Sequence, residues 1–162
     1  MFLNNEDAKK ILVLIDFDED NSNLTANEIL EKTKLELLKN LKPSDYFNIM
    51  LSNISIKKFR DNWMPATAEN IDLAFNELNS SLTSYSNFSN LLGTGIEFIN
   101  QDDSDSQILL ITNSDQYPGE EKANELTNDL VGLIKNNKKI NIVDFQEKNF
   151  EHYDGLDLYP TI

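Results

Sequence analysis

Apolar runs of strand length alternate along the chain with longer segments that have a helical period. The runs are apolar at consecutive positions, which is typical of strands buried on both faces of a parallel sheet. Alternation of apolar and polar residues in one further segment indicates a short edge strand. We predict buried strands at 11–15, 46–51, 108–111 and 140–145, and the edge strand at 54–59.

The segments between these runs carry apolar residues at spacings of three and four, which predicts amphipathic helices. The predicted helices span 25–41, 68–82, 88–99 and 119–136. Thr25 followed by Glu28 fits a capping box at the first helix start. Gly93 and Gly95 lower the helix propensity of the third helix. The residues from 146 onward have no clear period, and Leu156–Tyr159 is the candidate there for a further strand.

This alternation predicts the α/β class: a three-layer sandwich with a mostly parallel, doubly wound sheet, one short antiparallel edge strand and helices on both faces. The chain has 162 residues, a normal size for one domain. It contains no internal repeat or linker segment. We therefore expect residues 1–162 to form a single domain.

Charge and composition argue against several kinds of binding partner and chemistry. The chain has 28 acidic and 14 basic side chains, a formal net charge of -14, which disfavours binding to nucleic acid or anionic lipid. The absence of cysteine excludes thiolate chemistry. No apolar run reaches the roughly 18 residues of a membrane span, so we expect no membrane insertion. The first ten residues lack a signal-peptide pattern, and we expect any export signal to lie outside this sequence.

Oxygen-bearing side chains follow three elements whose ends should meet at one edge of the sheet. They lie in the segments 16–22, 86–88 and 112–115. In a doubly wound sheet ligands bind beyond the carboxyl ends of the strands, and oxygen ligands suit a hard cation such as Mg²⁺ or Ca²⁺.

Four segments, in this order and spacing, resemble the von Willebrand factor A domain, in the branch found in inter-alpha-trypsin inhibitor heavy chains and related bacterial proteins. The resemblance runs from about Lys9 to Phe145. It is carried by ILVLID, LKPSDYFNIMLSN, WMPATAENI and ILLITNSDQYPGEE. It implies a non-enzymatic protein-binding or assembly module of a cell-envelope or secreted system.

The resemblance also implies a metal-ion-dependent adhesion site, but a degenerate one. Asp16 matches the first aspartate of the family's Asp-x-Ser-x-Ser motif, whereas Asp18 and Asp20 replace the two serines. Ser86 stands where the family has threonine, and Asn113 stands where it has a later aspartate. Four of the five positions are therefore altered.

A second register is open for the same motif. Asp20 and Ser22 also read as its first two members, with Leu24 in place of the last serine and Thr33 at the family's helix spacing. We prefer Asp16, because it directly follows the apolar run and so belongs at the upper edge of the sheet.

The altered residues have opposing effects on a cation. Three carboxylates at alternate positions of one loop repel one another, and a divalent ion would relieve that repulsion. Aspartates are longer than serines and change the cavity, and Asn113 brings no charge. We expect no bound cofactor, with Mg²⁺ or Ca²⁺ as the alternative, and a weakened ability to recognise a partner's carboxylate.

Other residues do not indicate catalysis. His152 is the single histidine, and the chain has no Gly-x-Ser-x-Gly nucleophile elbow with which it could form a catalytic triad. We therefore expect a surface or packing role for His152. Gly93-Thr94-Gly95 lacks the Lys-Ser or Lys-Thr of a phosphate loop. Trp63 is expected to be buried rather than an exposed binding residue. Hydrolysis by the aspartate cluster would lack a separate general base.

A response-regulator receiver is the main alternative, because the first strand is followed by several acidic residues. That function would need a phosphoacceptor aspartate after a central strand and a lysine after the last one. The strand at 46–51 is followed by Ser52 and Asn53, and the strand at 140–145 by Gln146 and Glu147. We therefore favour a protein partner of unknown identity, and leave the oligomeric state open.

Overall fold

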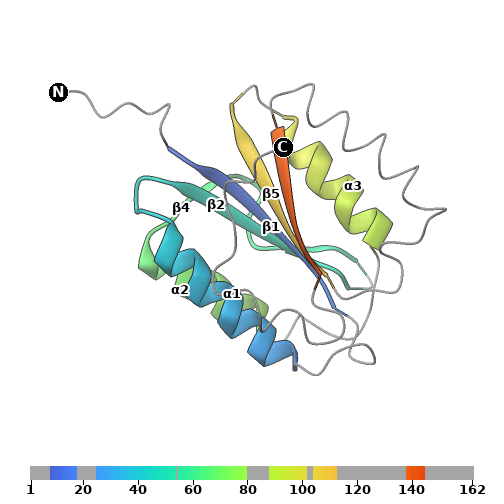
Figure 1. Cartoon of the computed structure of the whole chain (residues 1–162), viewed down its shortest axis with the longest axis horizontal. Coiled ribbons are helices and arrows are strands. Elements are labelled where there is room, and N and C mark those ends of the chain that lie inside the picture. The colour runs from blue at the N-terminus through green and yellow to red at the C-terminus, as the bar shows by residue number, and fades with distance from the viewer. Residues whose placement is uncertain are drawn as a thin grey trace.

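The computed structural model describes residues 8–17, 25–53, 55–79, 88–101, 104–112 and 138–144. These residues form three helices and one six-stranded sheet in an α/β arrangement (Figure 1). In chain order the elements are β1 (Lys10–Asp16), α1 (Ala26–Asn40), β2 (Tyr46–Leu51), β3 (Lys57–Lys58), β4 (Met64–Pro65), α2 (Ala68–Leu78), α3 (Phe88–Ile99), β5 (Ser106–Thr112) and β6 (Lys138–Asp144).

The sheet has the order β3-β2-β1-β5-β6, and β4 pairs with β2 beside β3. β1 pairs in parallel with β2 on one side and with β5 on the other, and β5 pairs in parallel with β6. β3 and β4 are short antiparallel partners of β2. The predicted class, a mostly parallel sheet with a short antiparallel edge, is confirmed.

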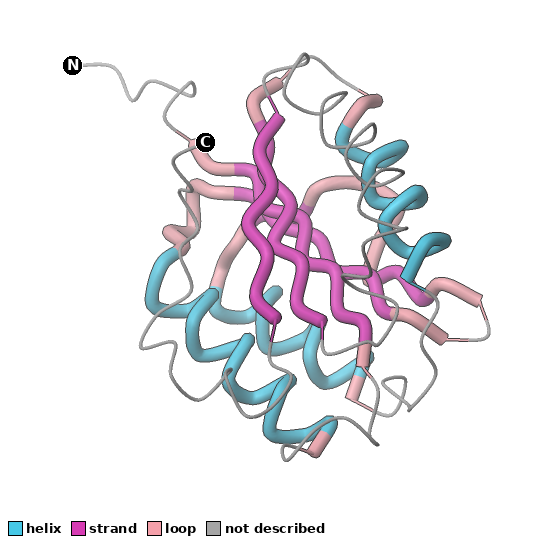
Figure 2. Tube along the Cα trace, turned by 45° about the vertical axis from the view of Figure 1, so that its right-hand side comes forward, coloured by secondary structure: helices cyan, strands magenta, loops and turns pink. Residues whose placement is uncertain are grey.

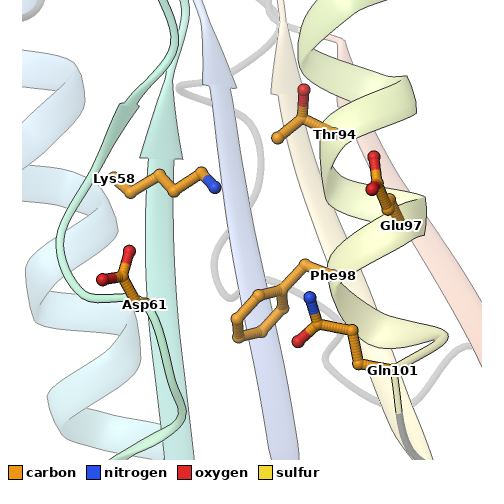
Figure 3. Close-up of a pocket in the computed structure, with 6 residues that line it drawn as sticks. All are labelled: Lys58, Asp61, Thr94, Glu97, Phe98 and Gln101. Carbon is orange, nitrogen blue, oxygen red and sulfur yellow. The ribbon is translucent and has the colours of Figure 1, made fainter.

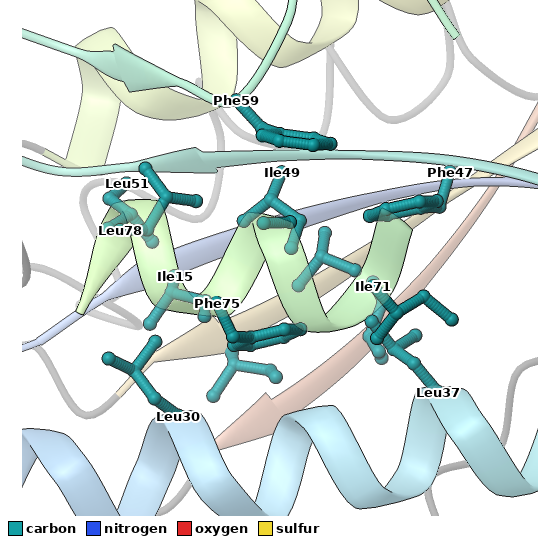
Figure 4. Close-up of a cluster of buried hydrophobic side chains, with 14 of the residues drawn as sticks. Ile15, Leu30, Leu37, Phe47, Ile49, Leu51, Phe59, Ile71, Phe75 and Leu78 are labelled. Carbon is teal, nitrogen blue, oxygen red and sulfur yellow. The ribbon is translucent and has the colours of Figure 1, made fainter. Parts of the chain in front are cut away.

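The two faces of β1 supply two separate cores, because successive side chains of a strand point to opposite faces. Ile11, Val13 and Ile15 pack with α1 and α2, and Leu12 and Leu14 pack with α3. Figure 2 shows α1 and α2 on one side of the sheet and α3 on the other. Helices therefore cover both faces, as predicted, and Figure 4 shows the larger of the two cores.

Thr25 caps α1 in the predicted way. Its hydroxyl accepts a hydrogen bond from the Glu28 backbone N–H, and the Glu28 carboxylate accepts one from the Thr25 N–H. This capping box satisfies backbone donors that the helix leaves unpaired. Thr67 caps α2 through the Asn70 N–H. α2 ends at Leu78, which is shorter than the predicted 68–82, and residues 80–82 lie outside the described part.

Gly95 allows α3 to lie close to β1. A methyl group at Gly95 would come within 2.7 Å of Leu14 Cδ1, and Leu14 is fully buried. At Gly93 the same methyl group would meet no atom within 4 Å. The two glycines thus differ: one is required by the helix-to-sheet distance, and the other only lowers helix propensity.

The edge beside β2 differs from the prediction. The expected strand at 54–59 is reduced to β3, and β4 was not predicted from the sequence. The buried Asn48 amide of β2 binds the segment between the two short strands. It donates to the Arg60 carbonyl at 2.7 Å and accepts from the Arg60 N–H at 3.2 Å. These bonds hold the segment after β3 in place against β2.

Asp45 joins three segments at the end of the sheet where β1 and β2 begin. One carboxylate oxygen accepts from the Lys9 N–H at 2.9 Å, and the other accepts from the Lys42 N–H at 2.7 Å. Its backbone carbonyl accepts from the Ala66 N–H at 2.8 Å. The side chain is buried. This aspartate therefore fixes the entry to β1, the turn before β2 and the exit from β4.

Arg60 and Glu77 form a two-bond ion pair, with nitrogen-to-oxygen distances of 2.9 and 3.0 Å. The hydrogen bonds from Arg60 lower the pKa of the Glu77 carboxyl. A group whose pKa is lower in the folded state stabilises that state above its unfolded pKa. This contribution is lost as pH falls through the lowered folded value.

We therefore expect wild type to be more stable than Glu77→Gln near pH 7, and the gap to close on acidification below about pH 4. Thermal unfolding of both proteins from pH 3 to pH 7 measures it. Glu69→Gln, a change at an exposed position of the same helix, is the control. A gap that stays constant over this range would show that the ion pair contributes nothing to stability.

Trp63 is half-buried and packs against the α3 core, with its ring 4.9 Å from that of Phe98 at an interplanar angle of 63°. This arrangement agrees with the expected packing role. The predicted helix at 119–136, the candidate strand at Leu156–Tyr159 and His152 lie outside the described residues.

Candidate functional site

The order of the strands identifies the carboxyl ends of β1 and β5 as the place where a ligand crevice is expected, which we call the Asp16 crevice. The chain passes from β1 to β2 on one side and later returns to β5 on the other side of β1. Such a reversal is where doubly wound sheets bind ligands. Asp16 is the last residue of β1 and is paired in register with Thr112, the last residue of β5. The structure therefore places Asp16 at the predicted edge.

Asp16 is held by a residue from the neighbouring strand. The Ser52 hydroxyl donates a hydrogen bond of 2.6 Å to the Asp16 carboxylate, and both side chains are fully buried. The Ser52 N–H donates to the Ile15 carbonyl at 3.0 Å, which continues the pairing of β1 with β2 beyond Leu51. A hydrogen bond of this length between two buried side chains constrains the rotamers of both. Ser52 thus fixes the position of the Asp16 carboxylate.

Ser52 was not among the predicted site residues. It immediately follows β2, and the carboxyl ends of parallel neighbours lie at the same edge of the sheet. The signal was therefore present in the sequence as a polar residue directly after an apolar strand. It was read only as a failure to match the phosphoacceptor of a receiver.

The other predicted metal ligands cannot be placed beside Asp16. Asp18, Asp20, Ser86 and Asn113 all lie outside the described residues, as do Ser22 and Leu24 of the second register. Thr33, also part of that register, is described: its hydroxyl donates to the Ile29 carbonyl at 2.8 Å on the buried side of α1. Thr33 thus lies within the core packing of the helix.

The described part of the chain does not by itself supply a cation site. Within it, no three carboxylate, imidazole or thiol groups come together. At the crevice it supplies one carboxylate and one hydroxyl, whereas Mg²⁺ and Ca²⁺ take six or more oxygen ligands. In addition, the Ser52 hydroxyl proton is directed to Asp16. The residues that the structure places here do not fit a complete metal centre.

Known proteins resemble this chain in structure alone. No protein-family model matches it, and no curated protein matches it in sequence. Among solved structures, a von Willebrand factor type A protein from Catenulispora acidiphila superposes with a TM-score of 0.62 at 11% identity, over 83% of this chain and 32% of that one. The conserved hypothetical protein BatB from Bacteroides thetaiotaomicron gives 0.60 at 10% identity, over 85% of this chain and 66% of that one.

An aerotolerance-related membrane protein from Bacteroides fragilis gives a TM-score of 0.55 at 14% identity, over 85% of this chain and 67% of that one. The chain spans about a third of the first of these structures and about two thirds of the other two. Identities this low bear on the fold and not on the function. Together with the strand order and the covered sheet, they show that this chain has the von Willebrand factor A fold.

Proposed function

We propose that this chain is a non-enzymatic protein-binding or assembly module whose recognition surface is the carboxyl edge of the sheet around Asp16. The observation that carries the proposal is the buried Asp16–Ser52 hydrogen bond at the point where the strand order reverses. The acidic residues 18–20 follow Asp16 closely in the sequence, and we propose that they contact the partner.

The chemistry of the pair supports binding rather than catalysis. Both side chains of the pair are fully buried, so neither the Ser52 hydroxyl nor the Asp16 carboxylate is exposed to a substrate. We infer that the Asp16 carboxylate is a positioning group, because a buried hydroxyl of the neighbouring strand holds it. In this proposal the Asp16–Ser52 pair stabilises the carboxyl edge of the sheet, to which the partner binds.

The recognition proposed here does not depend on a metal ion. Relative to the family motif, Asp18 and Asp20 add negative charge to the segment after β1, and Asn113 removes one from the segment after β5. Extra negative charge repels a ligand carboxylate. We therefore infer that the partner presents basic or neutral polar groups, in keeping with the net charge of -14.

The proposed location is the cell envelope or a secreted assembly. Support comes from one protein of similar structure, which is described as an aerotolerance-related membrane protein. Within the described residues, no helix has the length and apolarity to cross a bilayer.

Affinity capture tests the recognition surface. Tagged wild type, Asp16→Asn and Asp16→Ala are incubated with lysate of the source organism, with Mg²⁺ or with a chelator, and captured proteins are quantified by mass spectrometry. We expect the Asp16 variants to lose at least several-fold of the specific capture, and the chelator to leave it unchanged. Asp105→Asn is the matched control. Asp105 is exposed and directly precedes β5, so it lies at the amino end of that strand, away from Asp16.

Two outcomes would contradict the proposal. Equal capture by folded Asp16→Asn would place recognition elsewhere on the molecule. Saturable binding of Mg²⁺, Ca²⁺ or Mn²⁺ at micromolar concentration in calorimetry would instead favour a metal-dependent adhesion domain. Circular dichroism of each variant shows that a loss of capture is not a loss of fold.

A further inference from the structure

A hollow of about 210 Å³ lies between β3 and α3, on the face of the sheet that α3 covers. Residues from the β3 side form one wall, and residues of α3 and its end form the other (Figure 3). It is lined by Lys58, Asp61, Thr94, Glu97, Phe98 and Gln101. This hollow is separate from the Asp16 crevice, since none of its lining residues belongs to that edge.

The walls carry charges of both signs without ion pairs. Lys58 and Asp61 stand on one wall and Glu97 on the other, and Figure 3 shows the Lys58 side chain extending into the hollow. Among the described residues no ion pair joins any of the three, whereas the nearby Arg60 turns away to Glu77. The hollow therefore presents one ammonium and two carboxylates that a ligand can neutralise.

Phe98 offers a small apolar contact at the base of the hollow, because its side chain is only 6% exposed. Phe98 is buried, and its ring is held edge to face against Trp63. Thr94 and Gln101 add a hydroxyl and an amide to the rim. Pockets for drug-sized ligands begin at roughly 300 Å³, so this hollow suits a smaller molecule. A carboxylate on each wall favours a cationic ligand such as a guanidinium, which can form two parallel hydrogen bonds with a carboxylate.

We propose that this hollow binds a free basic α-amino acid, with L-arginine as the best fit. The ligand's carboxylate would pair with Lys58, and its ammonium and guanidinium would pair with Asp61 and Glu97 while the apolar stem lies over Phe98. The charges match in number: one negative and two positive groups on the ligand face one positive and two negative groups on the protein. The proposal does not rest on the function of the Asp16 edge.

Titration with L-arginine and agmatine tests this assignment. Agmatine is arginine without its carboxylate, so it carries a larger net positive charge. Simple attraction to an acidic protein would favour agmatine, whereas the proposed site favours arginine because of Lys58. Binding is followed on the intact chain by NMR shifts at 94–101 and by the emission of Trp63, the single tryptophan.

We expect arginine to bind with a Kd on the order of 1–10 mM and agmatine about 3- to 5-fold more weakly, as for exposed ion pairs. Lys58→Gln should abolish this preference, and Glu97→Gln should weaken both ligands. Glu69→Gln, which removes the same charge on the opposite face of the sheet, should change neither. All three positions are exposed, so the fold is retained.

The proposal is overturned if arginine shows no saturable shift up to about 20 mM, which is above the range expected for such contacts. It is also overturned if agmatine binds as tightly as arginine to wild type, or if Lys58→Gln keeps the preference for arginine. Shifts confined to residues outside the hollow would have the same meaning.

Discussion

Phe47→Ala is expected to lower the free energy of unfolding by about 3–5 kcal/mol, the largest effect of any change considered for this chain. Phe47 is fully buried in the core that α1 and α2 cover. Its ring stacks on that of Phe59, with centroids 5.7 Å apart and an interplanar angle of 23°. Removal of the ring leaves a cavity and takes away the surface on which the segment after β3 rests. Denaturant unfolding followed by far-ultraviolet circular dichroism measures the loss.

Leu73→Ala is the matched control, because Leu73 is a large apolar side chain that is 42% exposed. We expect it to change stability by less than about 0.5 kcal/mol. If Phe47→Ala cost less than about 1 kcal/mol, the ring would not be a central part of the packing. Since domains are stable by only about 5–15 kcal/mol, the expected loss is a large share of the total.

Asp45→Asn is expected to lower the free energy of unfolding by about 2–3 kcal/mol, although it preserves the shape of the side chain. Both carboxylate oxygens accept backbone hydrogen bonds, one from Lys9 and the other from Lys42. An asparagine has one oxygen, and its NH₂ group would face an N–H donor wherever the amide is turned. The buried position gives the unpaired groups no water to replace the lost bond. Thermal and denaturant unfolding would report the change.

The same substitution at the exposed Asp105 provides the comparison, and we expect it to have little effect. Asp45→Ala should cost at least as much as Asp45→Asn, since both accepting oxygens are lost. If Asp45→Asn were as stable as wild type, the two backbone contacts would contribute nothing net to the fold. The charge of the carboxylate would then have no structural role.

Periodicity was sufficient to predict the elements that bury continuous apolar surface. β1, β2, β5 and the helices α1 and α3 lie within a residue or two of the predicted bounds. The reason is that a parallel strand buried on both faces, and a helix with one apolar side, each impose a long-range constraint on many successive residues. The Thr25 cap is local in sequence and was predictable for that reason.

Features that depend on contacts between distant residues could not be predicted. β4 has only two residues and exists because β2 offers it an edge, so no pattern reveals it. Gly95 was read as a weakness of α3, whereas its absent side chain makes room for Leu14, which is about 80 positions away in the sequence. Asn48 sits within an otherwise apolar strand, and its partners become clear only once Arg60 is placed.

Of the candidate site residues, only the location of Asp16 can be compared with the prediction. The position of Asp16 at the upper edge followed from the end of an apolar run, and the structure confirms that position. Its partner Ser52 was visible in the sequence as a polar residue directly after an apolar strand, but its contact with Asp16 depends on which strand lies beside β1. The roles of Asp18, Asp20, Ser86 and Asn113 stay predictions.

The edge beside β2 also bears on whether a second chain could add a strand to this sheet. A long, regular edge strand offers a row of free backbone groups on which a second chain can add a strand and begin a fibre. Here the outer side of β2 is shared by two strands of two residues each, one of them Lys57–Lys58 and the other containing Pro65. Between them the Phe59 N–H is bonded to the Ile49 carbonyl, and the Asn48 amide holds the intervening segment. An incoming chain would find neither a continuous ladder nor a neutral surface, so this side of the sheet is protected against polymerisation.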